Sequence, residues 1–125
     1  MEIAENEYFK IWLDDGIMYI NYLAEHYDYT TIDEGIKTRL QKTKGMTYTV
    51  LADITKLKTL TKEAKIRLAQ NDSREGIIAT AIIFKSKFQE ALYNFLNLLY
   101  KAPSPTKMFT NRDRALAWLK KFEKK

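Results

Sequence analysis

The stretch that decides the fold is residues 77–84, which read IIATAIIF. Both alternating sets of side chains in it are apolar, with Thr80 as the one polar residue. A strand with one face in solvent alternates apolar and polar residues instead. The stretch is therefore typical of a strand that is covered on both faces, as in sheets with helices on either side. It predicts a layered α/β structure.

The sequence on either side of this stretch alternates helices and strands. Ser86 and Gln89 form a capping-box pattern, which opens a long helix to about Tyr100. Upstream, residues 48–52 form an apolar strand and a helix begins near Thr61. Downstream, after the loop 102–105, residues 106–109 form a short strand and a last helix follows that carries Ala115, Leu116, Trp118, Leu119 and Phe122.

The first third of the chain predicts a hairpin and one more helix. Residues 8–13 and 17–23 flank Asp15-Gly16, a dipeptide that favours a tight two-residue turn. Thr31 and Glu34 form a capping-box pattern, which predicts a helix to about Lys44. The resulting order predicts one α/β domain over residues 1–125. Its mixed sheet has about five strands, opens with an N-terminal β-hairpin and carries about four helices.

The composition excludes several classes of site. The chain of 125 residues has no cysteine, which rules out disulfides, thiolate nucleophiles and Cys-ligated zinc. Its four scattered glycines cannot form a glycine-rich phosphate loop. The single histidine, His26, has no second histidine as a metal partner and fits a surface loop. Because no nucleophile, base and orienting group belong together, we expect no cofactor, no metal site and no enzymatic activity.

Two features bear on where the protein acts. Residues 1–7 are acidic and lack the basic start of a signal peptide. The longest apolar run, 77–84, is much shorter than the roughly 20 residues of a membrane span. We expect a cytoplasmic protein without integral membrane association.

The net charge of +5 hides an uneven distribution. Residues 1–34 carry nine acidic side chains and one basic one, whereas the remainder carries seven acidic and twenty basic ones. The bases could cover ordinary solvated helix faces, or they could form a basic surface for an anionic partner. No nucleic-acid motif with stacking aromatics accompanies them, so we expect a protein partner and no nucleic acid.

Three segments resemble the STAS superfamily, whose architecture is also called SpoIIAA-like. Residues 50–57, which read VLADITKL, resemble its strand-then-loop motif "L-x-D-x-S-x-V". The buried strand 77–84 leads directly into a capped helix, and the tail 105–119 resembles the ending of small bacterial STAS-like proteins. The resemblance covers nearly the whole chain. It implies a fold whose members work by binding.

The resemblance also implies where a phosphoacceptor serine would lie, at about residues 62–64. This sequence has Lys-Glu-Ala there, so the Ser-Ser-Gly motif is absent. Glu63 places a carboxylate at that position, which would give a permanently phosphorylated-like surface. The simpler interpretation is a first-turn acid that interacts with the helix dipole. Thr61 likewise fits either a modified residue or an ordinary N-cap.

The candidate interaction surface therefore comprises Asp53, Thr55, Thr61 and Glu63. Asp53 and Thr55 follow a strand that is predicted to be parallel, and binding residues gather at the carboxyl ends of such strands. The alternative for Asp53 is a turn in which its own side chain caps the backbone.

The helix 86–100 is apolar around most of its circumference, which calls for burial on more than one side. Its candidate face comprises Phe88, Leu92, Tyr93, Phe95, Leu96 and Tyr100. Three interpretations stay open: cover by its own domain, a homodimer interface, or the wall of a pocket for an apolar ligand. The last is implied by the related architecture of lipid-binding CRAL-TRIO domains, with Phe88, Leu92, Phe95 and Trp118 as the lining.

We therefore expect a non-enzymatic protein-interaction or regulatory module, as a homodimer, whose partner the sequence does not identify. The alternative is a carrier or sensor of a small apolar ligand or lipid in a pocket beside helix 86–100.

Overall fold

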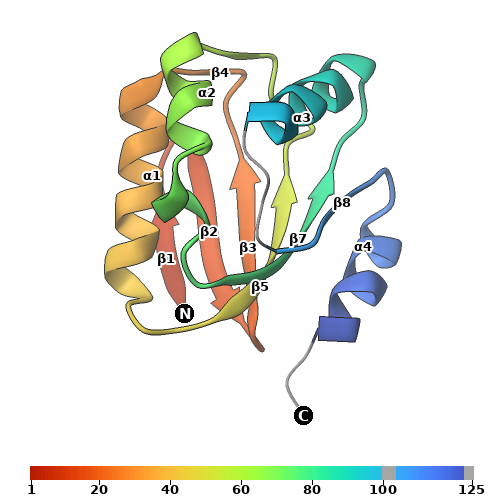
Figure 1. The fold of residues 1–125 in the computed structure, drawn as a ribbon. Coiled ribbons are helices and arrows are strands. Elements are labelled where there is room, and N and C mark those ends of the chain that lie inside the picture. Colours follow the sequence, from red (N-terminus) through yellow and green to blue (C-terminus); the bar gives the residue numbers. More distant parts are fainter. Residues whose placement is uncertain (100–103, 123–125) are drawn as a thin grey trace.

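A six-stranded mixed sheet forms the centre of the protein (Figure 1). The computed structural model describes the backbone of residues 1–99 and 104–122, and the side chains of residues 1–94 and 104–122. The strand order is β1-β2-β3-β5-β7-β8. The strands are β1 (Glu2–Glu5), β2 (Phe9–Asp14), β3 (Ile17–Tyr22), β5 (Tyr48–Asp53), β7 (Ile77–Ile83) and β8 (Thr106–Phe109).

The first three strands are antiparallel and the later ones are parallel. β1 pairs with β2 and β2 with β3 in antiparallel fashion, whereas β3–β5, β5–β7 and β7–β8 are parallel. Each parallel pair is joined through a helix, which confirms the predicted mixed α/β fold. The sheet has one strand more than predicted, and the additional strand is β1. Only Ile3 of its two central residues is fully buried, so this short edge strand has no periodic pattern.

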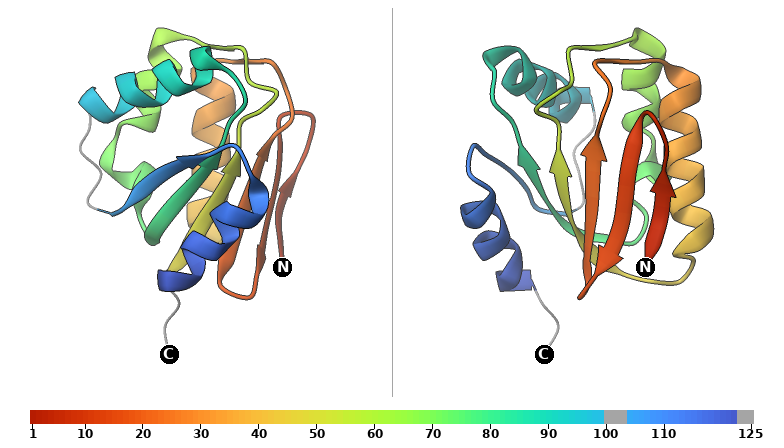
Figure 2. Two further views of the ribbon diagram at one scale, coloured as in Figure 1. Left: turned by 90° about the vertical axis from the view of Figure 1, so that its right-hand side faces the viewer. Right: turned by 180° about the vertical axis from the view of Figure 1, so that it is seen from behind.

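The helices are divided unequally between the faces of the sheet (Figure 2). α1 (Tyr29–Lys42), α2 (Lys62–Leu68) and α3 (Lys87–Leu99) lie on one face, where the larger core includes Ile32, Ala64 and Leu92. Of the described helices, α4 (Arg112–Leu119) alone covers the other face. It packs Ala115 and Leu119 on β5 and β7. β7 therefore has apolar neighbours on both faces, as its sequence predicts.

The turn between β2 and β3 confirms the predicted hairpin. Asp14 pairs with Ile17, so only Asp15 and Gly16 form the loop. Both adopt positive φ, 51° and 77°, which is the conformation that this two-residue turn requires.

The predicted start of the first helix is wrong by about one turn. The N-cap is Asp28, whose side chain accepts a hydrogen bond from the backbone N–H of Thr31 at 3.0 Å. The Thr31 hydroxyl accepts one in return from the backbone N–H of Asp28 at 3.1 Å. Thr31 is thus the last of the four residues of the capping box, at position N3, and not its first. Asp is as good an N-cap as Thr, and here it also lies one residue after buried Tyr27.

A second, two-stranded sheet extends the structure beyond the carboxyl ends of β3 and β5. β4 (His26–Tyr27) and β6 (Thr59–Leu60) pair in parallel. The Tyr27 hydroxyl donates to the Tyr8 carbonyl at 2.7 Å and accepts from the Ala24 N–H at 2.9 Å. These bonds fix the path of the chain from β3 into α1. Among the described residues, no helix is long and apolar enough to cross a membrane.

Candidate functional site

A surface groove lies where the carboxyl ends of β5 and β7 meet the start of α3. The residues that line it are Glu25, Thr55, Lys56, Leu57, Lys58, Lys85, Ser86, Phe88 and Gln89. The groove therefore joins Thr55, from the predicted loop surface, to Phe88, from the predicted helix face. Phe88 is an exposed aromatic side chain, 50% accessible to solvent.

Asp53 shapes the loop that forms one wall of the groove. Its Oδ1 accepts hydrogen bonds from the backbone N–H of Thr55 at 2.9 Å and from the Thr55 hydroxyl at 2.7 Å. This is the turn in which an Asp side chain caps its own backbone two residues on. Asp53 acts here on the loop, and Thr55 is the member of the pair that reaches the groove.

Gln89 holds this loop against α3. Its side chain is 2% exposed and donates through Nε2 to the carbonyls of Leu57 at 2.9 Å and Thr55 at 3.1 Å. Its Oε1 accepts from the backbone N–H of Lys85 at 2.9 Å. The expected N-cap bond from Gln89 N–H to the Ser86 hydroxyl is present at 3.1 Å. The Gln89 side chain, however, does not close the capping box. It binds the loop after β5 instead, which the sequence pattern does not indicate.

The other two residues of the predicted loop surface lie at the start of α2. Thr61 is the N-cap, and its hydroxyl accepts from the backbone N–H of Ala64 at 3.2 Å. Glu63 is exposed in the first turn. Neither residue lines the groove. The structure therefore separates the four predicted residues into Asp53 and Thr55 beside the groove and Thr61 and Glu63 on α2.

The lining of the groove carries more positive than negative charge. Lys56, Lys58 and Lys85 are its basic residues and Glu25 is its one acidic residue, with a carboxylate 2.6 Å from Lys58 Nζ. The hydrogen bond from Lys58 and its positive charge lower the pKa of Glu25. His26 lies nearby with an exposed ring whose Nδ1 is 2.7 Å from the Thr59 hydroxyl. Within the described residues, no group of His, Asp and Glu could hold a metal ion.

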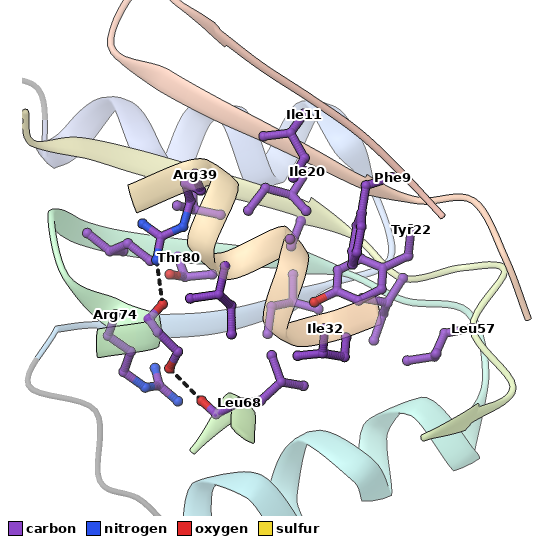
Figure 3. Close-up of a pocket in the computed structure, with 18 of the residues that line it drawn as sticks. Phe9, Ile11, Ile20, Tyr22, Ile32, Arg39, Leu57, Leu68, Arg74 and Thr80 are labelled. Carbon is purple, nitrogen blue, oxygen red and sulfur yellow. Dashed lines mark hydrogen bonds between the residues drawn. The ribbon is translucent and has the colours of Figure 1, made fainter. Parts of the chain in front are cut away.

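A separate apolar cavity of about 180 Å³ lies between the sheet and the helices α1 to α3 (Figure 3). Leu92 and Tyr93 line it, together with Ile20 and Ile82 from the sheet and Ile32 from α1. Ile20 and Ile82 lie on inner strands and face this helical layer, yet both keep part of their surface accessible. The space between the layers is therefore incompletely filled.

Two of the predicted lining residues do not belong to this cavity. Phe88 lies outside it in the first turn of α3. Trp118 lies across the sheet, where its ring packs against Phe109 and Phe122 with centroids 5.8 and 4.9 Å away. The helix α4 carries Trp118 to the opposite face, which spacing within one helix cannot indicate. The side chains of Phe95, Leu96 and Tyr100 lie outside the described residues.

Polar groups line two ends of the cavity. Figure 3 shows Arg39, Arg74 and Thr80 toward one end and Phe9, Tyr22 and Leu57 toward the other. Burial raises the pKa of the Tyr22 hydroxyl well above its usual range. The Arg39 side chain donates to the Tyr48 hydroxyl and to the carbonyls of Ser73 and Glu75 at 2.8 and 3.0 Å. In the sequence Arg39 is one of several basic residues on a helix that is expected to be solvated, so no local pattern distinguishes it.

The family model described as a domain of unknown function, DUF7793, matches residues 11–123. The chain belongs to this family. The matched region runs from β2 through α4 and so includes both the groove and most of the cavity lining of this DUF7793 protein. A comparison with curated proteins finds no match.

Two solved structures share the fold of this DUF7793 protein. One is an uncharacterised protein of the DUF3478 family with a SpoIIAA-like fold from Shewanella loihica PV-4, at 21% identity and a TM-score of 0.63. That comparison covers 89% of this chain and 91% of the other. The second is an anti-sigma factor antagonist from Mycobacterium paratuberculosis, at 10% identity and a TM-score of 0.57, covering 90% and 92%. These likenesses confirm the SpoIIAA-like fold that the resemblance to the STAS superfamily predicts.

Proposed function

We propose that the protein is a cytoplasmic regulatory module that acts by binding another protein and not by catalysis. Its partner docks in the groove between Thr55 and Phe88. The observation that carries this proposal is the exposed Phe88 side chain in a groove edged by three lysines. Aromatic side chains with a polar rim are the usual anchors of protein interfaces. The fold of an anti-sigma factor antagonist adds support, because that name describes a protein that acts on another protein.

The chemistry of the groove suggests which partner it fits. Phe88 offers an apolar contact. Lys56 and Lys85 offer positive charge beside it that no carboxylate of the described residues pairs with. A partner segment with an apolar side chain flanked by carboxylates would match both features. The attraction between charges would act mainly on the rate of association and weaken with salt.

The test compares two equally exposed apolar residues. Phe88→Asp should abolish capture of a partner from the native host, because it removes the anchor and places a negative charge in the groove. Ile66→Asp is the matched control, since Ile66 on α2 is 48% exposed and lies outside the groove. Equal capture by wild type and Phe88→Asp would overturn the proposal, and so would equal loss with both variants.

The start of α2 is a second part of the proposed surface. Glu63→Lys reverses an exposed charge without touching a core residue. If the partner recognises this carboxylate as it would recognise a phosphate, Glu63→Lys should abolish binding of the partner. Glu63→Gln should then lose most of that binding. Unchanged binding of both variants would restrict the interface to the groove.

We also propose that a second copy of the chain can occupy the Phe88 side of α3. Tyr93 is less suited to this contact than Phe88, because its hydroxyl donates to the Thr106 carbonyl at 3.3 Å within the same chain. Light scattering should give a mass that rises with concentration for wild type and stays monomeric for Phe88→Asp. A monomeric wild type at high concentration would remove the homodimer from the proposal.

The apolar cavity favours a second function, that of a carrier or sensor of a small apolar ligand. Native mass spectrometry of protein from the native host should then show a bound small molecule. Replacing Ala52 in the cavity wall by Ile should displace it.

A further inference from the structure

We propose that the cavity selects a small carboxylic acid, with the carboxylate on Arg39 and the apolar body among the isoleucines. This inference rests on the second proposed function, that the cavity takes a ligand, and adds the class of ligand. It concerns a site distinct from the Phe88 groove, since Leu57 is the one residue that lines both.

The size of the cavity limits the ligand. An apolar cavity of about 150 Å³ takes up a benzene molecule. The 180 Å³ found here thus accommodates one aromatic ring or a chain of about six to eight carbons. Apolar side chains from the sheet, from α1 to α3 and from the segment after β5 make up most of the wall. They would bury the body of such a ligand and offer it no hydrogen bonds.

Arg39 is a buried cation without an ion-pair partner among the residues that the structure describes. It is 3% exposed, and its three hydrogen bonds go to neutral acceptors: the Tyr48 hydroxyl and the carbonyls of Ser73 and Glu75. None of the carboxylates in the described part of the chain forms an ion pair with it. A buried charge is costly unless it is paired.

The other buried arginine of the protein shows the contrast. Arg67 is also 3% exposed, but it contacts two carboxylates, Asp33 at 2.8 Å and Asp72 at 2.7 Å. Arg67 joins α2 to α1 and to the turn Asn71–Arg74, whereas Arg39 joins α1 to β5 and to the segment that contains Ser73 and Glu75. The described part of the chain thus supplies acids for one buried guanidinium and none for the other, which is the one that lines the cavity.

The lining of the cavity offers Arg39 no carboxylate. No Asp or Glu is among the residues that line it. A guanidinium carries five N–H donors, and three hydrogen bonds of Arg39 leave two of them for a ligand. Figure 3 shows Arg39 toward one end and Tyr22 toward the other, so head and tail of the ligand have distinct places.

The first experiment titrates the full chain with octanoate and, as the uncharged analogue, with octanol, by calorimetry. Octanoate should bind about tenfold or more tightly, because a charge-assisted hydrogen bond is stronger than a neutral one. Arg39→Met should abolish the preference. Equal affinity for the two compounds would overturn the role of Arg39 and leave the cavity as an apolar ligand site.

Two further variants keep the test decisive if Arg39→Met does not fold. Ala52→Ile adds three carbon atoms to the cavity wall and leaves Arg39 intact, so octanoate binding should be lost. Ala117→Ile makes the same change on the exposed surface of α4 and should bind octanoate as wild type does. Binding that survives Ala52→Ile would place the octanoate elsewhere and overturn the proposal. If neither compound binds wild type, the ligand function fails together with the inference.

Discussion

The side-chain amide of Gln89 donates a 2.9 Å hydrogen bond to the carbonyl of Leu57, which lies thirty-two positions earlier in the chain. This bond joins the first turn of α3 to the loop after β5. The proposed groove exists because the two segments are held together at this point. Gln89 is therefore a positioning residue for the surface that contains Phe88.

Removing the polar atoms of Gln89 should destabilise the protein. Gln89→Leu keeps most of the volume but leaves the carbonyls of Thr55 and Leu57 without their donor. We expect a loss of about 2–3 kcal/mol in the free energy of unfolding, because buried groups lose their partners. Urea denaturation measures this loss. The exposed Gln70 is the control, and Gln70→Leu should change stability by no more than about 0.5 kcal/mol. Equal stability of the two variants would contradict the role given to Gln89.

The ion pairs of Arg67 hold α1, α2 and the turn Asn71–Arg74 together. Arg67→Met should cost about 3 kcal/mol, because it leaves the Asp33 carboxylate partly buried with one partner fewer. Lys37→Met removes the other, largely exposed cation that contacts Asp33 and should cost less than about 1 kcal/mol. A similar effect of both changes would show that burial of Arg67 contributes nothing.

The stability of the protein should fall at acid pH through Asp33. Hydrogen bonds from Arg67 and then Lys37 lower the pKa of this carboxyl in the folded protein. The unfolded chain therefore binds more protons than the folded one in the acid range. The stabilisation is present above the unfolded pKa of about 4 and is lost as pH falls from there through the lower folded pKa. Asp33→Asn should be less stable near neutral pH and show a shallower decline in acid. An unchanged pH profile would count against the ion pair.

The hydroxyl of Tyr27 should contribute to the stability of the folded protein in addition to the burial of its ring. Tyr27→Phe leaves the Tyr8 carbonyl and the Ala24 N–H without this partner and should cost about 1–2 kcal/mol. Tyr29→Phe is the matched control, since Tyr29 is 45% exposed.

Burial also raises the pKa of Tyr27 to about 12. Stability from this group is present below its unfolded pKa of about 10 and declines as pH rises through the folded value. Absorbance of tyrosinate follows this titration.

Much of the fold is visible in local patterns. The doubly apolar stretch 77–84 and the Asp15-Gly16 turn predict β7 and the first hairpin, and the structure confirms both. The edge strand β1 has no such pattern, because it is only four residues long and buries one of them, Ile3. The start of α1 is a choice between two nearby caps, which local preference alone does not settle.

The candidate sites divide in the same way. Asp53, Thr55 and Phe88 can be predicted as candidates, because strand ends and broad apolar helix faces are recognisable in the sequence. No local pattern indicates Gln89 or Arg39, because each donates to two backbone carbonyls that lie more than thirty residues away in the sequence.

The sequence by itself determined the succession of strands and helices, since periodicity and turn chemistry act over a few residues. Tertiary structure alone decided that α4 covers one face of the sheet with Trp118, that three helices leave a cavity on the other, and that a buried arginine borders that cavity without an acid. Burial and desolvation depend on which distant segments pack together, and only the folded chain brings those segments into contact.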